Sequence, residues 1–489
     1  MQNYRTLLGL SLFLTLGACT ENRVTSPDLP SAGAAPLFAA APAGGRAIPD
    51  QFIVVLKEGS DPRAVAAVAD VAPRYVYEHA LTGFAARLNA GQVTALRNNP
   101  NVAYVEEDQA IALTATQNSA TWGIDRTDQR ALPLSGTYNY NQDGTNVHAY
   151  IIDTGLRYDH AEFSGRVGGG YDAVDGGSAD DCNGHGTHVS GTVGGTTYGM
   201  AKKATIHPVR VLDCNGSGTT SGVVAGMDWV TANRVKPAVA NMSLGGGAST
   251  AMDDATNRMI NAGVITVVAA GNDNANACNY SPARVAAAIT VGATDKTDAR
   301  ASYSNYGSCL DIFGPGSSIT SAWHTSSSAT NTISGTSMAT PHVAGAAALF
   351  LSQVTGATNA QTRDQLVYHA TSGKVTNPGS GSPNKLLHSL FYVYKGSLSG
   401  AGVSQWSPST SGYSANVSGP HIAKLTGPSG TDFDLYLQKW NGSAWADVAS
   451  GTSSSSSESV TYSGATGSYR WEAYSYSGSG SYTLTTTRP

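Results

Sequence analysis

Two kinds of apolar segment alternate through the middle of the chain. Short and nearly continuous apolar runs predict buried strands, and the longer mixed runs between them predict helices. The strands are expected at residues 148–152, 205–211, 238–242, 264–269 and 288–291. The helices are expected at residues 188–193, 221–231, 250–262 and 340–351. Because strands that alternate with helices build a parallel sheet, we predict an α/β fold for this part.

The segments on either side have other patterns. Residues 51–105 begin and end with an apolar strand and contain two helical segments, the first of which is capped by Asp61, so they predict a small α+β unit. Beyond residue 395 charges are sparse, and short alternations of apolar and polar residues predict an antiparallel β-sandwich. We therefore expect the α+β unit at 49–114, the parallel-sheet domain at 115–395 and the β-sandwich domain at 396–489.

The first residues have the pattern of an export signal. Arg5 precedes an apolar run from Leu7 to Leu16, which is too short to anchor the chain across a bilayer. The sequence Leu16-Gly17-Ala18-Cys19 resembles a lipoprotein cleavage box, in which Cys19 would carry a lipid. The alternative is an ordinary cleavage site with an incidental cysteine. Both interpretations predict export, with a signal at 1–19 and a flexible linker at 20–48.

Composition narrows the possible partners. Charged residues make up 13% of the 489 residues, and 29 basic against 34 acidic side chains give a net charge of −5. This balance gives no support to a nucleic-acid partner. Besides Cys19 there are four cysteines, which in an exported chain predict two disulfides. Three pairings are possible, and a zinc site is disfavoured because no C-x-x-C pair is present. The four are Cys182, Cys214, Cys278 and Cys309.

Three motifs together indicate nucleophilic catalysis. Asp153 follows a predicted strand, His185 lies between two glycines, and Ser337 lies in a small-residue turn just before an apolar helix. An attacking serine needs a base and an acid that orients the base, and the chain order Asp, His, Ser is one of the known orders of such triads. A solvated turn is the alternative for Asp153. A metal pair of His185 with His188 is disfavoured because the glutamate of the H-E-x-x-H pattern is missing.

A further strand end carries an amide. Asn272 follows the apolar run that ends at Ala270. Its side-chain amide and the backbone N–H of Ser337 are predicted to donate to an oxyanion, a role whose loss typically costs about 100- to 1000-fold in rate. The alternative for Asn272 is a left-handed turn residue.

With these motifs and the segments 241–246, 271–275 and 304–307, the chain resembles the subtilase family over residues 115–390, in its proteinase K–aqualysin branch. The resemblance implies Asp153, His185 and Ser337 as the triad, Asn272 in the oxyanion hole, and a subtilisin-like catalytic domain. It also implies that residues 49–114 are an inhibitory pro-segment that the enzyme removes from itself. The disulfides that it implies are Cys182–Cys214 and Cys278–Cys309.

Substrate is expected to bind as an added β-strand. Because main-chain pairing is insensitive to side chains, broad specificity is expected, and a small uncharged lining predicts a preference for apolar or aromatic side chains next to the scissile bond. The expected binding residues are Gly216, Ser217 and Gly218 on one side, Ser243, Leu244 and Gly245 on the other, and Ala269, Ala270 and Gly271 in the pocket.

Structural calcium is also expected from the resemblance. One site would consist of Asp311 with the carbonyls of Ala286 and Ala288, and oxygen ligands of this kind suit Ca²⁺. The second candidate site consists of Asp125, Asp128 and Gln129, for which a surface pair at a helix start is the alternative.

The resulting hypothesis is a secreted, calcium-stabilised serine endopeptidase made as a self-processing zymogen. Its expected partners are polypeptide substrates and its own pro-segment, and we expect a monomer. The rival hypotheses are a catalytically idle surface-binding protein, in which the aromatic residues of the C-terminal domain bind a polymer instead of filling its core, and an esterase that uses the same triad.

Overall fold

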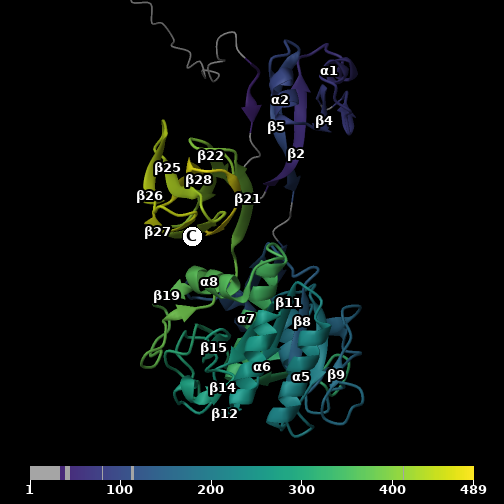
Figure 1. Ribbon diagram of the computed structural model, residues 1–489, viewed down its shortest axis with the longest axis vertical. Coiled ribbons are helices and arrows are strands. Elements are labelled where there is room, and N and C mark those ends of the chain that lie inside the picture. Colours follow the sequence, from purple (N-terminus) through teal and green to yellow (C-terminus); the bar gives the residue numbers. More distant parts are fainter. Residues whose placement is uncertain (1–33, 39–44, 80, 112–114, 411) are drawn as a thin grey trace, which may run out of the picture. The chain divides into compact units, whose positions relative to one another are not determined.

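The computed structural model describes residues 34–38, 45–79, 81–111, 115–410 and 412–489. The expected signal with Cys19 and most of the expected linker lie outside the described residues. The described residues divide into two compact units: those within 34–38 and 49–108 form one, and those within 45–48 and 109–489 form the other (Figure 1). No helix within the described ranges is long and apolar enough to cross a membrane.

The first unit is a five-stranded sheet with two short helices. The helix starts follow from local chemistry: Asp61 accepts hydrogen bonds from the first turn of one helix, and Asn89 forms a capping box with Gln92 at the other. Phe84 and Leu96 are fully buried between sheet and helices. The predicted α+β unit is thereby confirmed. Its elements are β1 (Leu37–Phe38), β2 (Gly45–Leu56), α1 (Pro62–Val68), β3 (Tyr75–Tyr77), β4 (Gly83–Arg87), α2 (Ala90–Arg97) and β5 (Val102–Ile111).

The second unit contains the predicted parallel sheet. Its nine strands have the order β19-β20-β16-β15-β13-β11-β8-β10-β9, and every neighbouring pair is parallel except β19 with β20 at one edge. The five predicted strands are present as β8 (His148–Asp153), β10 (Thr205–Arg210), β11 (Ala238–Met242), β13 (Val264–Ala269) and β15 (Ile289–Thr294). The remaining strands are β9 (Tyr171–Asp172), β16 (Ile312–Pro315), β19 (Thr371–Ser372) and β20 (Lys385–Leu386).

Helices cover both faces of this sheet. Successive residues of β8 show the two faces: Ile151 packs in the core that contains Val189 and Val343, and Ile152 packs in the core that contains Met227. The covering helices are α4 (His185–Gly194) and α7 (Thr336–Leu351) on the first face and α5 (Thr220–Asn233) and α6 (Thr250–Asn261) on the second. The helices α3 (Trp122–Thr127) and α8 (Asn359–His369) were not among the predicted ones.

The predicted starts of two helices were late, with a consequence for the site. The helix expected from residue 188 begins at His185, and the helix expected from residue 340 begins at Thr336. Apolar periodicity marks the buried middle of each helix, whereas the first turns carry the polar site residues His185 and Ser337. Gly184 has a φ of +110°, a left-handed conformation that favours glycine, and it directly precedes α4.

The C-terminal part is a sandwich of two antiparallel sheets, with the orders β21-β29-β24-β27 and β22-β28-β25-β26. Trp471, Tyr469 and Phe433 are fully buried between them, so these aromatic residues fill the core as the sequence favoured, whereas Trp440 and Tyr476 are exposed. The boundary expected between residues 395 and 396 lies inside β21. The strands are β21 (Tyr392–Leu398), β22 (Ser404–Ser407), β23 (Tyr413–Ala415, paired with β28), β24 (Gly419–Thr426), β25 (Asp432–Trp440), β26 (Trp445–Gly451), β27 (Ser457–Gly464), β28 (Gly467–Ser477) and β29 (Gly480–Thr487).

Short elements and two disulfides hold the connecting loops. The disulfides are Cys182–Cys214 and Cys278–Cys309, which is the pairing implied by the resemblance. Small antiparallel pairs are β6 (Ala115–Asn118) with β7 (Thr137–Tyr140), β12 (Gly246–Gly247) with β14 (Tyr280–Ser281), and β17 (Ile319–Ala322) with β18 (Thr330–Ile333).

Candidate active site

The sheet brings the ends of three neighbouring strands to one edge. Strand β8 ends at Asp153, and its neighbour β11 is followed directly by Ser243. Strand β13 pairs with β11 on the other side and is followed by the turn that carries Asn272. The carboxyl ends of parallel strands are where sites form in open α/β sheets, because all of them face the same crevice. The predicted site residues are therefore side by side for a topological reason.

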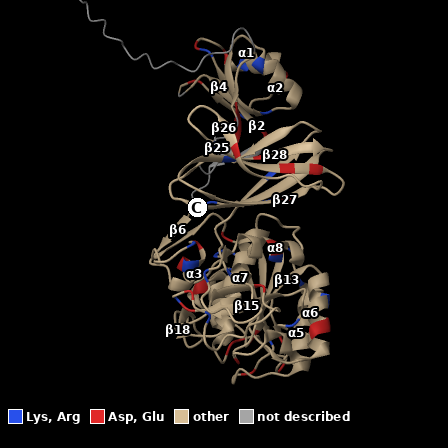
Figure 2. Cartoon of the chain, turned by 90° about the vertical axis from the view of Figure 1, so that its left-hand side faces the viewer, with Lys and Arg blue, Asp and Glu red and all other residues tan. Residues whose placement is uncertain are grey.

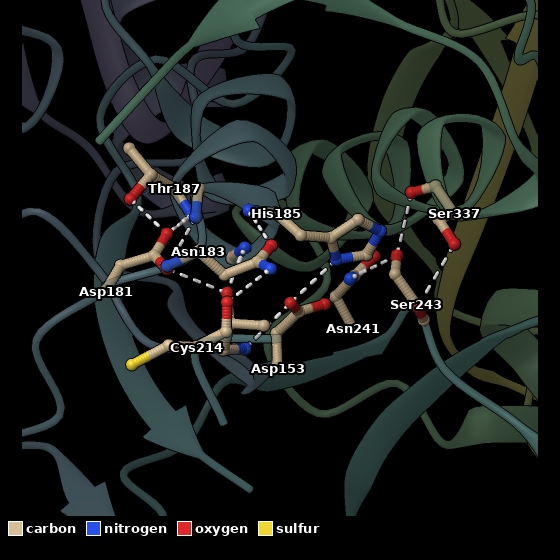
Figure 3. Close-up of polar contacts among 12 residues, drawn as sticks. Asp153, Asp181, Asn183, His185, Thr187, Cys214, Asn241, Ser243 and Ser337 are labelled. Carbon is tan, nitrogen blue, oxygen red and sulfur yellow. Dashed lines mark hydrogen bonds and ion pairs between the residues drawn. The ribbon is translucent and has the colours of Figure 1, made fainter. Parts of the chain in front are cut away.

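Asp153 and His185 form a close pair at this edge. Oδ1 of Asp153 lies 2.7 Å from Nδ1 of His185, and the side chain of Asp153 is fully buried whereas that of His185 is 25% exposed. Since a carboxylate only accepts hydrogen bonds, Nδ1 carries the proton of the neutral ring and Nε2 is the basic nitrogen. Figure 3 shows the ring between Asp153 and Ser337, with its second nitrogen on the side of Ser337.

Asp181 fixes the loop that delivers His185. Its carboxylate accepts from the backbone N–H groups of Asn183, Gly184 and Thr187 at 2.8–3.0 Å, and from the hydroxyls of Thr154 and Thr187 at 2.9 and 2.6 Å (Figure 3). These bonds lower the pKa of Asp181 against the opposing effect of its burial. Sequence reasoning missed this residue, although an acidic side chain just before a helix start is a capping signal.

The charges around His185 favour its protonated form. Burial acts to lower the pKa of His185, but the charge of Asp153, its hydrogen bond and the charge of Asp181 outweigh burial, so the pKa is raised. His188 differs from it, because burial lowers its pKa to about 4 and its Nε2 lies 3.0 Å from the carbonyl oxygen of Ile319. These two histidines therefore have separate surroundings, which argues against the metal pair.

Ser337 lies in the first turn of α7 and is tied to the strand side of the site. Its hydroxyl donates to the carbonyl oxygen of Ser243 at 3.1 Å, and the hydroxyl of Ser243 donates to the carbonyl oxygen of Ser337 at 2.8 Å. Nδ2 of Asn241 donates to the Ser243 hydroxyl at 2.9 Å. Asn241, at the end of β11, thus orients the Ser243 hydroxyl, and Ser243 in turn holds Ser337 in position (Figure 3). The sequence alone did not indicate this role for Asn241.

The amide of Asn272 is oriented by α7. Its Oδ1 accepts from the backbone N–H of Thr336 at 2.8 Å and from the hydroxyl of Thr336 at 3.0 Å. Because the oxygen is engaged, the NH₂ group is directed away from Thr336, and Nδ2 lies 3.6 Å from where a Cβ on Gly335 would be. A donor therefore lies beside the start of α7, where the helix dipole also favours negative charge.

A pocket of about 340 Å³ opens between these groups. It is lined by Leu244, Gly245, Gly246, Gly247, Ala269, Ala270, Gly271, Asn272, Asp273, Tyr280, Ser281, Ala283, Thr336 and Ser337. The predicted pocket residues Ala269–Gly271 and the predicted binding residues Leu244 and Gly245 are among them. The wall from Tyr280 to Ala283 was missed, because it is brought in by the pairing of β12 with β14, which leaves no local signal.

The other predicted binding segment lies apart from this pocket. Gly216, Ser217 and Gly218 are exposed in the loop between β10 and α5, and in the described part of the chain they are not among the residues that line the pocket. A hydrogen bond from Asp213 N to the carbonyl oxygen of Ser217, at 2.7 Å, closes this loop. A role in binding an extended substrate stays a prediction for these three residues.

The candidate calcium site at Asp125, Asp128 and Gln129 has a chemistry that suits a cation. Both oxygens of Asp125 accept hydrogen bonds from residues 135–136, and Oδ2 of Asp128 accepts from the backbone and side chain of Asn139. Oδ1 of Asp128 is buried and has no hydrogen-bond partner among the described residues. Burial raises the pKa of Asp128 to about 6, and the nearby charge of Asp125 acts in the same direction. With Oε1 of Gln129 bound to Ser135 N nearby, these oxygens fit a bound cation.

The candidate calcium site at Asp311 does not fit in the same way. Oδ2 of Asp311 accepts from the backbone N–H of Thr290 at 2.9 Å, and the carbonyl of Ala286 accepts from Nη1 of Arg363 at 2.8 Å. Nε of Arg363 lies 4.0 Å from Oδ1 of Asp311. A guanidinium therefore lies among the atoms that the resemblance assigns to calcium, and the predicted ligand Ala288 is buried beside them. Within the described residues, no group of three His, Cys, Asp or Glu side chains is placed to hold a metal.

Comparison with known proteins agrees with this geometry. Residues 144–387 match the model of the subtilase family, and residues 51–114 match the model of peptidase inhibitor I9. The chain is 56% identical over 412 residues to an extracellular serine proteinase of Thermus sp. (strain Rt41A), covering 79% of this chain and 98% of that protein. It is 54% identical over 322 residues to alkaline serine exoprotease A of Vibrio alginolyticus, covering 64% of this chain and 60% of that protein.

A solved structure of a related protease is also similar to this chain. The crystal structure of a cold-adapted subtilisin-like serine proteinase is 56% identical in sequence, with a TM-score of 0.55 over 56% of this chain and 99% of that chain. The parallel sheet, the Asp–His pair at its edge and these matches lead to one conclusion: the chain belongs to the subtilase family.

Proposed function

We propose that Asp153, His185 and Ser337 are the catalytic triad of this protein, which is a secreted serine endopeptidase made as a zymogen. The observation that carries the assignment is the 2.7 Å contact between Asp153 and His185, at the sheet edge where Ser337 lies in the first turn of α7. A buried carboxylate, a partly exposed imidazole and a serine at a helix N-terminus are the three parts that acyl transfer needs.

Each residue has a defined task in the proposed reaction. Nε2 of His185 takes the proton of the Ser337 hydroxyl as the oxygen attacks the peptide carbonyl, and the ring then gives this proton to the leaving amine. Asp153 keeps the proton on Nδ1 and stabilises the imidazolium that forms. A water molecule, deprotonated in turn by His185, releases the acyl group from Ser337 and restores the enzyme.

The oxyanion of the tetrahedral intermediate is stabilised by two donors. These are Nδ2 of Asn272 and the backbone N–H of Ser337 at the start of α7. The support for Asn272 is that Thr336 engages its oxygen and leaves the NH₂ group free to donate. Because both donors are fixed before the reaction, they need no reorganisation when negative charge develops.

Substrate binds as an extended segment along residues 243–245, with residues 216–218 on its other side. The side chain that precedes the scissile bond enters the pocket lined by Ala269, Ala270 and Gly271. A pocket of about 340 Å³ with small residues along its wall accommodates an apolar or aromatic side chain. We therefore propose broad specificity with a preference for such residues.

Processing supplies the remaining partners. Residues 51–114 match an inhibitor model, so the enzyme's own pro-segment is its intramolecular inhibitor. We propose that the enzyme cuts its own chain near residue 114.

The same proposal includes an export signal at residues 1–19, with a lipid on Cys19 as the narrower alternative. It also includes domain boundaries at 48, 114 and 395. A monomeric state and the absence of a nucleic-acid partner stay predictions.

Calcium is proposed only at the candidate site formed by Asp125, Asp128 and Gln129. Asp125, Asp128 and Gln129 would hold the ion, and the unpartnered buried oxygen of Asp128 supports this choice. Bound only to the folded chain, the ion would stabilise it by mass action. It would have a structural role and take no part in the reaction.

The proposal is tested with a peptide anilide that carries an aromatic residue before the scissile bond. We expect the wild type to cleave it, and Ser337→Ala and His185→Ala to lose at least about 1000-fold in kcat, since removal of a triad member leaves only the weak residual catalysis of the remaining site. Ser334→Ala, at an exposed serine three positions away, is the matched control and should retain activity. Hydrolysis of an ester analogue without hydrolysis of the anilide would favour the esterase instead.

A further inference from the structure

The surroundings of Asp311 contain a cation that belongs to the chain itself. Asp311 directly precedes β16, and the segment 286–288 directly precedes the neighbouring strand β15. The helix α8 packs along this corner of the sheet. Two of its side chains, one helical turn apart, reach the backbone carbonyls of the segment.

Asn359 is the first of these side chains. Its Nδ2 donates to the carbonyl of Ala287 at 2.5 Å, while its Oδ1 accepts from the backbone N–H of Thr266 in β13 at 2.8 Å. The side chain of Asn359 is buried, and it joins α8 to β13 and to the segment that precedes β15. Because Asn359 fixes the start of α8, the position of the next residue on the same helix face is also defined.

Arg363 is the second. Its Nη1 donates to the carbonyl of Ala286 at 2.8 Å, and its Nε lies 4.0 Å from Oδ1 of Asp311 and 3.7 Å from Oδ1 of Asp364. The side chain of Arg363 is 29% exposed and that of Asp311 is 22% exposed. The guanidinium thus contacts both kinds of oxygen, carbonyl and carboxylate, that a calcium ion would need here.

A calcium ion and this guanidinium exclude each other. Calcium binds oxygens at about 2.3–2.6 Å, so an ion on Ala286 and Asp311 would lie within a few ångströms of Nη1, without water between two positive charges. Arginine does not lose its charge at any pH that the protein would meet. One of the two cations must leave, and Arg363 is covalently attached, so its effective concentration is high.

We propose that Arg363 takes the place of calcium at Asp311 and closes that site with a permanent cation of the chain. The corner between β15 and β16 is then held without a metal, and its stability does not depend on the calcium concentration. This inference is independent of the catalytic roles proposed above, because it concerns only the charges around Asp311. It also separates the two sites that the sequence suggested, leaving calcium to Asp125 and Asp128.

The test counts calcium ions bound per chain, by equilibrium dialysis against ⁴⁵Ca²⁺, for four full-length proteins in a Ser337→Ala background that prevents self-digestion. These are the parent, Asp311→Asn, Arg363→Ala and the double variant Asp311→Asn/Arg363→Ala. We expect the parent and Asp311→Asn to bind the same number of ions, Arg363→Ala to bind one more, and the double variant to lose the additional ion. Arg363→Gln should repeat the gain if the alanine variant folds poorly, and near-ultraviolet circular dichroism checks the fold of each.

A matched control separates the local effect from the loss of one positive charge. Arg258 is an exposed arginine of α6, and Arg258→Ala should bind as many ions as the parent. The proposal is overturned if Asp311→Asn binds one ion fewer than the parent, because calcium would then occupy Asp311 beside Arg363. It is also overturned if Arg363→Ala and Arg363→Gln, both folded, bind no additional ion, or if Arg258→Ala gains one as well.

Discussion

Ser243 and Ser337 exchange two hydrogen bonds. The hydroxyl of Ser243 donates to the carbonyl oxygen of Ser337 at 2.8 Å, and the hydroxyl of Ser337 donates to the carbonyl oxygen of Ser243 at 3.1 Å. This exchange couples the end of β11 to the first turn of α7, so the segment proposed to bind substrate also fixes the residue proposed to attack it. In the resting enzyme the Ser337 hydroxyl therefore has a defined position on the strand.

Removal of the Ser243 hydroxyl should weaken catalysis more than binding. Ser243→Ala takes one neutral hydrogen bond from the backbone of Ser337, which is worth about 0.5–1.5 kcal/mol, so kcat should fall about 2- to 10-fold. KM should change little, because the substitution leaves intact the backbone of residues 243–245, which is proposed to pair with substrate. Steady-state kinetics on a peptide anilide measure both, with Thr332→Ala on exposed β18 as the control. An increase in KM at unchanged kcat would contradict the positioning role.

Asn272→Ala should lower kcat by about 100- to 1000-fold with a nearly unchanged KM, because the lost donor acts on the oxyanion and not on the bound peptide. Asn274→Gly is the matched control: it removes a neighbouring exposed amide at a residue with φ of +51°, which glycine adopts readily. Equal losses in both variants would mean that the loop is deformed, and the assignment of Asn272 to the oxyanion hole would fail.

The pH dependence of kcat/KM should reflect the raised pKa of His185. The base must be neutral, so activity rises with pH through the pKa of the free enzyme, and the midpoint should lie above 6.5, the ordinary value. Asp181→Asn removes a negative charge that raises this pKa, so the midpoint should move to lower pH. A midpoint that stays in place would show that Asp181 does not act on His185 electrostatically.

Asp181→Asn should also lower the free energy of unfolding. The folded-state pKa of Asp181 is lowered, so its contribution is present above the unfolded pKa of about 3.9 and is lost as pH falls through the folded pKa. Asp181→Asn should therefore destabilise the protein at pH 7 by about 1–3 kcal/mol, since an amide cannot accept all five hydrogen bonds. Thermal unfolding of the inhibited enzyme at pH 7 and at a series of lower pH values measures the loss caused by the substitution. This loss should shrink as the pH falls below about 3.9, and an equal loss at every pH would contradict this account.

Calcium removal should destabilise the protein through Asp128. For an ion at 100 times its dissociation constant the stabilisation is about 2.7 kcal/mol, which a chelator should abolish. In Asp128→Asn the chelator should have no further effect on the melting temperature. Asp254→Asn, an exposed carboxylate of α6, should respond to the chelator like the wild type. If Asp128→Asn retains the full response to the chelator, the ion binds elsewhere.

The sequence predicted those parts of the structure that leave a local trace. Continuous apolar runs located the five strands. The residue types at strand ends indicated Asp153 and Asn272, and the small-residue turn before an apolar helix indicated Ser337. The starts of α4 and α7 were placed too late, because their first turns carry the polar site residues and lack apolar periodicity. A helix start that contributes to a site is thus the place where periodicity is least informative.

Local sequence patterns could not predict those residues whose role depends on a partner far away in the sequence. The pocket wall at Tyr280 is set by the pairing of β14 with β12, and Arg363 acquires its role only when α8 packs against Ala286 and Asp311. The resemblance supplied the ligands of a calcium site at Asp311 but did not include the guanidinium beside them. A family pattern transfers the residues that it contains, whereas a neighbouring side chain can change what those residues bind.

The central claim is that Ser337 carries out the peptide-bond cleavage by which the enzyme removes its own pro-segment. The most direct measurement compares the intact masses of the secreted wild type and Ser337→Ala, produced side by side in a host that lacks other extracellular proteases. We predict that the wild type loses the segment up to about residue 114 and that Ser337→Ala retains it. A mature mass in the Ser337→Ala protein, or an unprocessed wild type that also leaves peptide substrates intact, would contradict the account.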